Sequence, residues 1–150
     1  MTRWSPERRF ARNVLVAWFA WALSFFLPAA ALRGFHVYEL KGDIVFPGWQ
    51  AAAICVVNPE GLGLHGHVAH LFRLMGLTNV VMAGALATLV TSRRTVRHAF
   101  MFLAAGSAFV DAMALVWFHE MLSYGYGVWL ASFVTMALAL SRDQSASRPF

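Results

Sequence analysis

The stretch from Ala99 to Phe118 reads AFMFLAAGSAFVDAMALVWF and holds a single charged residue, Asp111. A helix needs about 20 mainly apolar residues to cross the hydrocarbon of a bilayer, and this run has that length. Backbone groups in hydrocarbon must pair with one another, so only helices and closed barrels span membranes. Because the apolar residues are continuous rather than alternating, the stretch predicts a membrane-spanning helix.

Three further runs have the same character, and they are Val14–Leu32, Val68–Val90 and Leu122–Leu140. The chain of 150 residues is 59% hydrophobic and only 13% charged. A soluble domain is about half apolar and about a quarter charged. The composition therefore agrees with the runs, and we predict an all-α membrane protein with four transmembrane helices.

The connections predict how these helices are arranged. The segments TSRRTVRH at 91–98 and SYGYG at 123–127 are short, which makes the second, third and fourth helices antiparallel neighbours. We expect one domain over residues 1–150, an antiparallel bundle with a long first outer loop at 33–66, and a cytoplasmic tail at 141–150. Pro28 is expected to bend or end the first helix.

The basic residues predict the orientation. Most of them flank the runs on one side, and these are Arg3, Arg8, Arg9, Arg12, Arg93, Arg94, Arg97, Arg142 and Arg148. Only Arg33 and Lys41 fall on the other side. By the positive-inside rule, both termini are cytoplasmic, and we expect a multi-pass protein of a bacterial cytoplasmic (inner) membrane. This distribution explains the sequence pI of about 10.4 without any nucleic-acid partner.

One part of the outer loop is apolar but too short to span. The segment Trp49–Val57 lies between the turn signals Pro47-Gly48 and Asn58-Pro59. A strand, a short interfacial helix and a shallow re-entrant segment all remain open for residues 47–59. We favour an amphipathic segment lying on the outer end of the bundle, with Trp49 at headgroup depth.

Polar residues inside the predicted spans form the first candidate site. Inserting a charged side chain at the centre of a membrane helix costs roughly 2.5–3.5 kcal/mol of free energy, so each such residue is expected to have a structural or functional role. On the third helix Asp111 shares a face with small residues, namely Ala104, Ser107, Ala108 and Ala114. Matching depths predicts that Asp111 bonds to Asn79 or Ser132, with an Arg73–Asp111 salt bridge as second choice. We interpret this set as a polar link that fixes helix register, and a proton or ion relay is the alternative.

The histidines of the outer face form the second candidate site. His67 and His70 share one face of the second helix, and His119 with Glu120 ends the third at the same depth. We expect a hydrogen-bonded cap of these four residues. Imidazole and carboxylate are also ligands for zinc or copper, and paired histidines hold haem iron, so a metal ion or haem is the alternative. Cys55 is the only cysteine, which excludes chemistry by a cysteine pair.

Three short motifs carry a resemblance to a family. They are SFFLPA at Ser24–Ala29, PGWQA at Pro47–Ala51 and YGYGVWLAS at Tyr124–Ser132. Together they resemble small uncharacterised four-span bacterial membrane proteins, a resemblance that implies architecture and no activity. The plan is also similar to that of claudins, but the two loop cysteines and the Trp-Gly-Leu-Trp signature of that family are not here.

These patterns favour a non-catalytic integral membrane protein, an accessory, assembly or packing subunit of a larger membrane complex. Its expected partners are the lipid bilayer and other membrane subunits or further copies of itself, and no cofactor is expected. The alternative is a metal- or haem-binding redox protein that uses the outer histidines. A third hypothesis is an oligomeric channel or carrier, in which Arg73, Asn79 and Asp111 would be the polar residues of the transport path.

Overall fold

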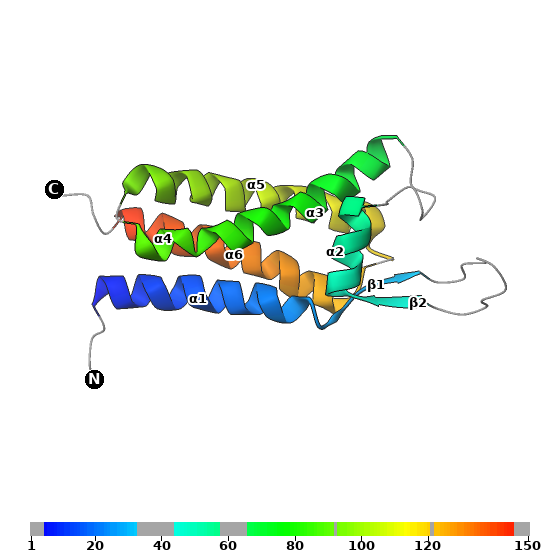
Figure 1. The fold of residues 1–150 in the computed structure, drawn as a ribbon, viewed down its shortest axis with the longest axis horizontal. Helices are drawn as coiled ribbons and strands as arrows, with labels where there is room; N and C mark the ends of the chain where they lie inside the picture. Colours follow the sequence, from blue (N-terminus) through cyan, green and yellow to red (C-terminus); the bar gives the residue numbers. More distant parts are fainter. Residues whose placement is uncertain (1–4, 33–43, 58–65, 92, 121, 146–150) are drawn as a thin grey trace.

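The computed structural model describes residues 5–32, 44–57, 66–91, 93–120 and 122–145. The elements in chain order are α1 (Pro6–Ser24), β1 (Pro28–Leu32), β2 (Ile44–Pro47), α2 (Gly48–Val57), α3 (His67–Ala85), α4 (Ala87–Val90), α5 (Arg94–Phe118) and α6 (Tyr124–Ser145). The helices α1, α3, α4, α5 and α6 lie lengthwise beside one another, and we call them the helical body (Figure 1). The elements β1, β2 and α2 sit at one end of this body and form the cap.

Among the described residues, three helical segments are long and apolar enough to cross a membrane: His67–Val90, Arg94–Phe118 and Tyr124–Arg142. They correspond to the second, third and fourth predicted runs. The second segment comprises two helices, α3 and α4, which meet at Leu86. The fourth helix reaches Ser145, so the first five residues of the predicted tail at 141–150 are helical.

The first helix differs from its predicted bounds of 14–32. It begins at Pro6, where the Ser5 side chain accepts a hydrogen bond from the backbone N–H of Arg8 at 3.4 Å. It ends at Ser24, because the chain turns ahead of Pro28 and then forms β1. Its uncharged part, Asn13–Ser24, is 12 residues long. This part is shorter than the roughly 20 apolar residues that a span needs.

The cap joins two segments that are far apart in the sequence. Strands β1 and β2 pair antiparallel, with Ala30 opposite Phe46 and Leu32 opposite Ile44. The predicted first span included residues 28–32 in its helix, which is wrong, because these residues form β1. Of the three conformations left open for this segment, residues 48–57 form a helix, which packs on α3; Gln50 is its only strongly polar side chain. The helix is therefore apolar on nearly all sides rather than amphipathic.

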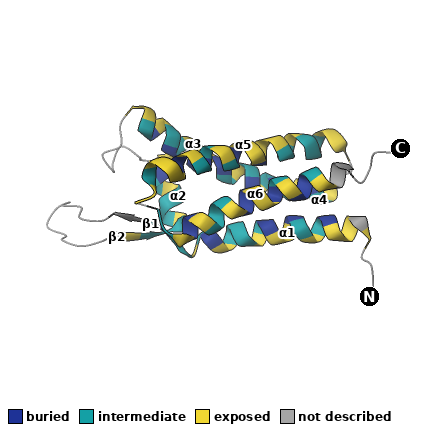
Figure 2. Ribbon diagram, turned by 180° about the vertical axis from the view of Figure 1, so that it is seen from behind, coloured by how far each residue is buried: buried dark blue, intermediate teal, exposed yellow. Residues whose placement is uncertain are grey.

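Burial follows the arrangement of the helices. Helix α6 packs against both α1 and α5, and its Phe133, Met136 and Leu140 are completely buried. The small face predicted on α5 is confirmed by the burial of Ala104, Ser107, Asp111 and Ala114. Large apolar side chains are exposed on the helices of the body, for example Phe19, Val80 and Phe109. Exposed positions alternate with buried ones along these helices (Figure 2). Such a surface is suited to contact with lipid.

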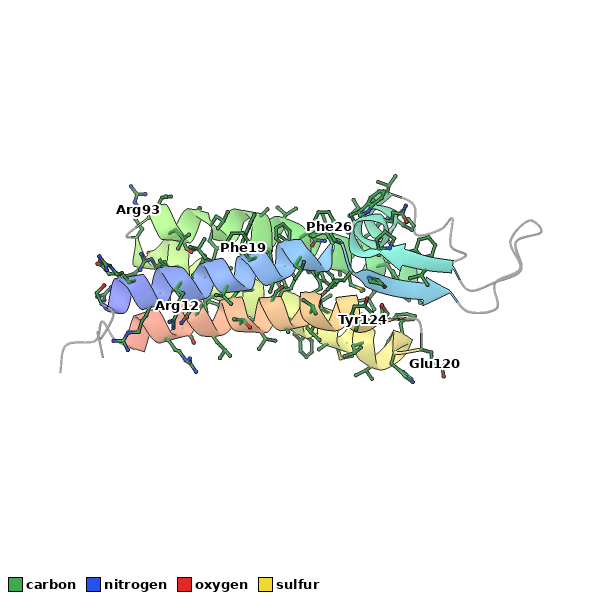
Figure 3. All side chains as sticks on the ribbon, turned by 90° about the horizontal axis from the view of Figure 1, so that it is seen from below. Arg12, Phe19, Phe26, Arg93, Glu120 and Tyr124 are labelled. Carbon is green, nitrogen blue, oxygen red and sulfur yellow. The ribbon has the colours of Figure 1, made fainter. Side chains whose placement is uncertain are left out.

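The two ends of the helical body differ in charge. Arg12 and Arg93 lie at the end far from the cap, whereas Glu120 and Tyr124 lie at the cap end (Figure 3). At the first end the guanidinium of Arg97 lies 4.5 Å from the centre of the Phe10 ring, a cation–π contact between α5 and α1. We call this end the arginine end.

Candidate functional site

A pocket opens where the cap meets the helical body. It encloses about 510 Å³ of empty space, including the part that is open to the outside. Its walls come from the end of α1, from β1, α2 and α3, and from the start of α6. The lining residues are Ser24, Phe25, Ala29, Ala30, Gly48, Ala51, Ala52, Cys55, Phe72, Met75, Gly76, Asn79, Leu122, Tyr126 and Trp129. The wall is mostly apolar and aromatic, as is usual for pockets that hold small molecules.

The three motifs of the sequence analysis meet in this pocket. Ser24–Ala29, Pro47–Ala51 and Tyr124–Ser132 each contribute residues to its wall. No site was predicted here from the sequence. The recurring small and aromatic residues of the motifs were the signal that could have found it, because such residues line close junctions between elements.

Close backbone contacts hold the cap in place. The N–H of Gly48 donates to the Leu27 oxygen at 2.9 Å, and the N–H of Trp49 donates to the Phe25 oxygen at 3.0 Å. A Cβ atom on Gly48 would lie 2.8 Å from the Cα atom of Phe25 and would also meet the backbone oxygen of Ser24. This approach is possible only without a side chain, so glycine is required at the start of α2.

A second junction joins the cap to the turn before α6. Ala30 forms an isolated antiparallel bridge with Leu122, and the N–H of Ser123 donates to the Ala29 oxygen at 3.0 Å. The hydroxyl of Ser123 also donates to the backbone oxygen of Pro28. These bonds extend the pairing of β1 onto the helical body. They fix the strand that forms one wall of the pocket.

Asn79 is the polar centre of the pocket wall. Its Oδ1 atom accepts hydrogen bonds from the indole nitrogens of Trp21 at 2.8 Å and of Trp129 at 3.0 Å. Its Nδ2 group donates to the Gly76 oxygen at 3.0 Å. Asn79 on α3 therefore connects α1 and α6. The sequence analysis placed Asn79 in a polar link inside the membrane, but expected Asp111 rather than two tryptophans as its partner.

Asp111 is completely buried, and neither of its carboxylate oxygens has a hydrogen-bond partner among the residues that the structure describes. The hydroxyl of Tyr126 donates to the backbone oxygen of Asp111 at 2.6 Å, not to the carboxylate. Among the described residues, neither Asn79 nor Ser132, the two partners predicted first, gives the Asp111 carboxylate a hydrogen bond. Asn79 is occupied by the indoles, and the Ser132 hydroxyl donates to the Trp129 oxygen at 2.5 Å in its own helix.

The unpaired carboxylate leads to a prediction on stability. Burial of a polar group without a partner costs about 1–3 kcal/mol in proteins. Leucine has the same branching as aspartate and carries no polar atoms. We expect Asp111→Leu to raise the free energy of unfolding by about 1–3 kcal/mol, measured by denaturation in detergent micelles. A loss of stability would mean that the carboxylate has a partner in the folded protein.

Cys55 on α2 lies in the same wall. Burial raises the pKa of the Cys55 thiol to about 12, and the nearby Asp111 carboxylate acts in the same direction. Only a thiolate is a good nucleophile, so this thiol is protonated and unreactive near neutral pH. Cys55 therefore serves as an apolar wall residue rather than as a reactive group.

The four residues of the second candidate site lie at the same end of the helical body as β1, β2 and α2. His67 and His70 are exposed on α3, and His119 and Glu120 are exposed after α5. Within residues 5–32, 44–57, 66–91, 93–120 and 122–145, no group of three or more His, Cys, Asp or Glu is placed to hold a metal ion. Two further histidines of the predicted outer loop, His36 and His65, lie outside the described residues. The hydrogen-bonded cluster of these four residues and the haem alternative stay predictions.

Comparison with known proteins adds no further assignment. No protein family, curated protein or solved structure matches this chain.

Proposed function

We propose that this chain is a non-catalytic integral membrane protein that serves as an accessory, assembly or packing subunit of a larger membrane complex. In this proposal α1, α3–α4, α5 and α6 are four antiparallel spans in a bacterial inner membrane. The arginine end faces the cytoplasm, where both termini lie, and the cap faces the other side. The arginines of the N-terminal segment and of α1 provide the cytoplasmic anchor for the shortest span.

The cap is the observation that carries this proposal. Its backbone is bonded to the helical body on both sides of the pocket, through Gly48 and through Ser123. It exposes apolar side chains near the expected water boundary, with Trp49 53% and Val57 78% exposed. Fixed surfaces that combine aromatic and aliphatic residues with few charges are typical of protein interfaces. A rigid apolar cap is therefore suited to hold a neighbouring subunit.

Site-specific crosslinking tests this role. A photoreactive amino acid at Val57 in the cap is expected to link the chain to a discrete neighbouring protein in native membranes. The matched control is Val90, which is 89% exposed and lies near the arginine end. Discrete protein adducts from position 57 but not from position 90 would support the proposal. Adducts with lipid alone at position 57 would contradict it.

The orientation has its own test. We expect a membrane-impermeant thiol reagent added outside to label Lys41→Cys and to spare Ser145→Cys, both in a Cys55→Ser background. The reason is the excess of arginine at one end of the helical body, which is retained on the cytoplasmic side. The same reagent should reach position 145 once the membrane is permeabilised. Labelling of position 145 alone in intact cells would reverse the proposed orientation.

A further inference from the structure

One face of α1 carries positive charge at its start and apolar side chains along the rest of its length. The buried residues Phe10, Val14 and Ala17 mark the face of α1 that packs on the helical body. On the opposite face a second set is exposed, and its members are Arg8, Arg12, Val16, Phe19 and Leu23. Because these positions are three or four residues apart, they form one continuous row along the helix, which we call the α1 stripe.

The two arginines of the α1 stripe are placed to bind one anion together. Residues four apart in a helix are neighbours on its surface, and like charges at this spacing destabilise the helix, so an anion between Arg8 and Arg12 offsets their repulsion. Glu7 is not placed to do this, because its neighbours three and four residues further along α1 are apolar. The hydrogen bond from Arg12 to the Asn13 side chain at 3.5 Å uses one of the five N–H donors of the guanidinium.

The position of this pair along the helical body agrees with the level of lipid phosphates. The guanidinium of Arg97 lies 4.5 Å from the centre of the Phe10 ring, so Phe10 is level with the start of the apolar run Ala99–Phe118. Arg8 lies two residues before Phe10, and Arg12 lies two residues after it. Side chains of a helix lean toward its N-terminus, which directs the guanidinium of Arg12 away from the hydrocarbon and toward the head groups.

The apolar part of the α1 stripe has the length of one acyl chain in one leaflet. Val16, Phe19 and Leu23 are 56%, 63% and 57% exposed. From Arg12 to Leu23 the helix rises by about 16 Å. Half of the hydrocarbon thickness of a bilayer is about 15 Å. An acyl chain whose phosphate lies at Arg12 therefore reaches the end of the stripe.

We propose that the α1 stripe binds one anionic phospholipid of the cytoplasmic leaflet. Its phosphate lies between Arg8 and Arg12, whose planar guanidinium groups match the geometry of phosphate oxygens. One acyl chain packs along Val16, Phe19 and Leu23. A zwitterionic lipid has the same phosphate but also carries a cation, which the excess of arginine at this end of the helical body repels. This inference rests on the proposed placement of α1 in the membrane, and it is independent of the role proposed for the cap.

Photocrosslinking in vesicles of defined composition tests the preference for an anionic lipid. The full chain, with a photoreactive amino acid at position 19, is reconstituted in equal parts of phosphatidylglycerol and phosphatidylcholine with identical acyl chains. We expect phosphatidylglycerol adducts to exceed phosphatidylcholine adducts at least about tenfold by mass spectrometry, because each arginine near an anionic head group contributes a factor of about five. The matched control is Phe109 on α5, which is 67% exposed, and its adducts should reflect the equal mixture.

The outcomes at the two positions separate the phospholipid site from the placement of α1. Adducts at Phe19 in the mixing ratio of the two lipids would overturn the site and leave the placement of α1 in the membrane intact. Lipid adducts at Phe109 without any at Phe19 would contradict that placement and overturn the inference with it.

Two double variants remove the same charge from different places at the arginine end. Arg8→Gln with Arg12→Gln should abolish the enrichment of phosphatidylglycerol at Phe19. Arg93→Gln with Arg94→Gln changes the start of α5 and should retain the enrichment (Figure 3). Enrichment that persists in the first variant would overturn the site. Equal loss in both variants would also overturn it, because the preference would then come from the overall charge of this end.

Thermal unfolding of each variant shows that it is folded before the adducts are compared. If the double variant of α1 does not fold, Arg8→Gln alone replaces it, because Arg8 is exposed in the first turn of α1. This single change should lower the enrichment at Phe19 by about fivefold. The single variant Arg93→Gln is then its control and should leave the enrichment unchanged. Unchanged enrichment in folded Arg8→Gln would overturn the site.

Discussion

Replacing Gly125 by alanine is expected to lower the free energy of unfolding by about 3 kcal/mol. A Cβ atom at this position would lie 2.8 Å from the carbonyl carbon of Pro28 and 2.9 Å from the Cβ atom of Leu27, and would also meet the Pro28 oxygen. The nearest of these atoms belong to backbone, which cannot move aside as a flexible side chain can. The substitution must push β1 away from α6 and weaken the bonds at Ser123.

Gly127 provides the matched control for Gly125. It lies two residues later in the same helix, is exposed, and has nothing within 4 Å of an added Cβ atom. Alanine favours helix over glycine by up to about 1 kcal/mol, so Gly127→Ala should be neutral or slightly stabilising. Both variants are compared with the wild type by denaturation in micelles, followed by tryptophan fluorescence. Equal effects at positions 125 and 127 would contradict the close contact of β1 with α6.

Replacing Asn79 by leucine is expected to cost about 2–4 kcal/mol of stability. The Oδ1 atom of Asn79 accepts from the indoles of Trp21 and Trp129, and leucine would leave both N–H groups without an acceptor in an apolar region. Each unsatisfied buried donor costs about 1–3 kcal/mol. Hydrogen bonds between membrane helices have modest net values, so most of the expected loss comes from these two orphaned donors.

A double-mutant cycle isolates the bond between Asn79 and Trp21. Trp21→Phe removes one of the two donors, so Asn79→Leu should cost less in that background than in the wild type. Val80→Leu is the control on the same helix, because Val80 is 68% exposed, and it should change stability by less than about 0.5 kcal/mol. Additive effects of the substitutions at positions 79 and 21 would mean that the two side chains do not interact.

The helices of this fold were largely predictable, because their signal is local. Continuous apolar runs of the required length identified the three segments that are able to span a membrane. The start of α1 was missed because Arg8, Arg9 and Arg12 interrupt the apolar pattern, although Ser5 and Pro6 are good starting residues for a helix.

The cap was not predictable in the same way. The segment PAAAL of β1 has low strand propensity, and it is a strand because it pairs with Ile44–Pro47 and bridges to Leu122. Such pairing joins residues far apart in the sequence and leaves no local pattern. For α2, the two turn signals predicted the limits of the segment, but its short apolar run did not distinguish a helix from a strand or a re-entrant segment.

The hydrogen-bond partners of the intramembrane polar residues could not be predicted from the sequence either. Matching depths placed Asp111, Asn79 and Ser132 at similar levels, but depth does not fix the rotation of each helix about its axis. Rotation decides which side chains meet, and it directs Asn79 toward Trp21 and Trp129. An indole N–H inside a membrane needs an acceptor, so Trp21 and Trp129 were themselves a sign that a polar side chain lies nearby.

An engineered disulfide tests most directly the central claim that the cap is joined to the helical body through β1. Ala30 and Leu122 form an antiparallel bridge, and opposite residues of such a pair lie at Cα distances suited to a disulfide. In a Cys55→Ser background, Ala30→Cys with Leu122→Cys should form an intramolecular disulfide on mild oxidation, seen as a reversible shift in gel mobility. The pair Val90→Cys with Leu122→Cys, at opposite ends of the helical body, should remain reduced. Free thiols or only intermolecular crosslinks at positions 30 and 122 would contradict the described junction and the pocket that it encloses.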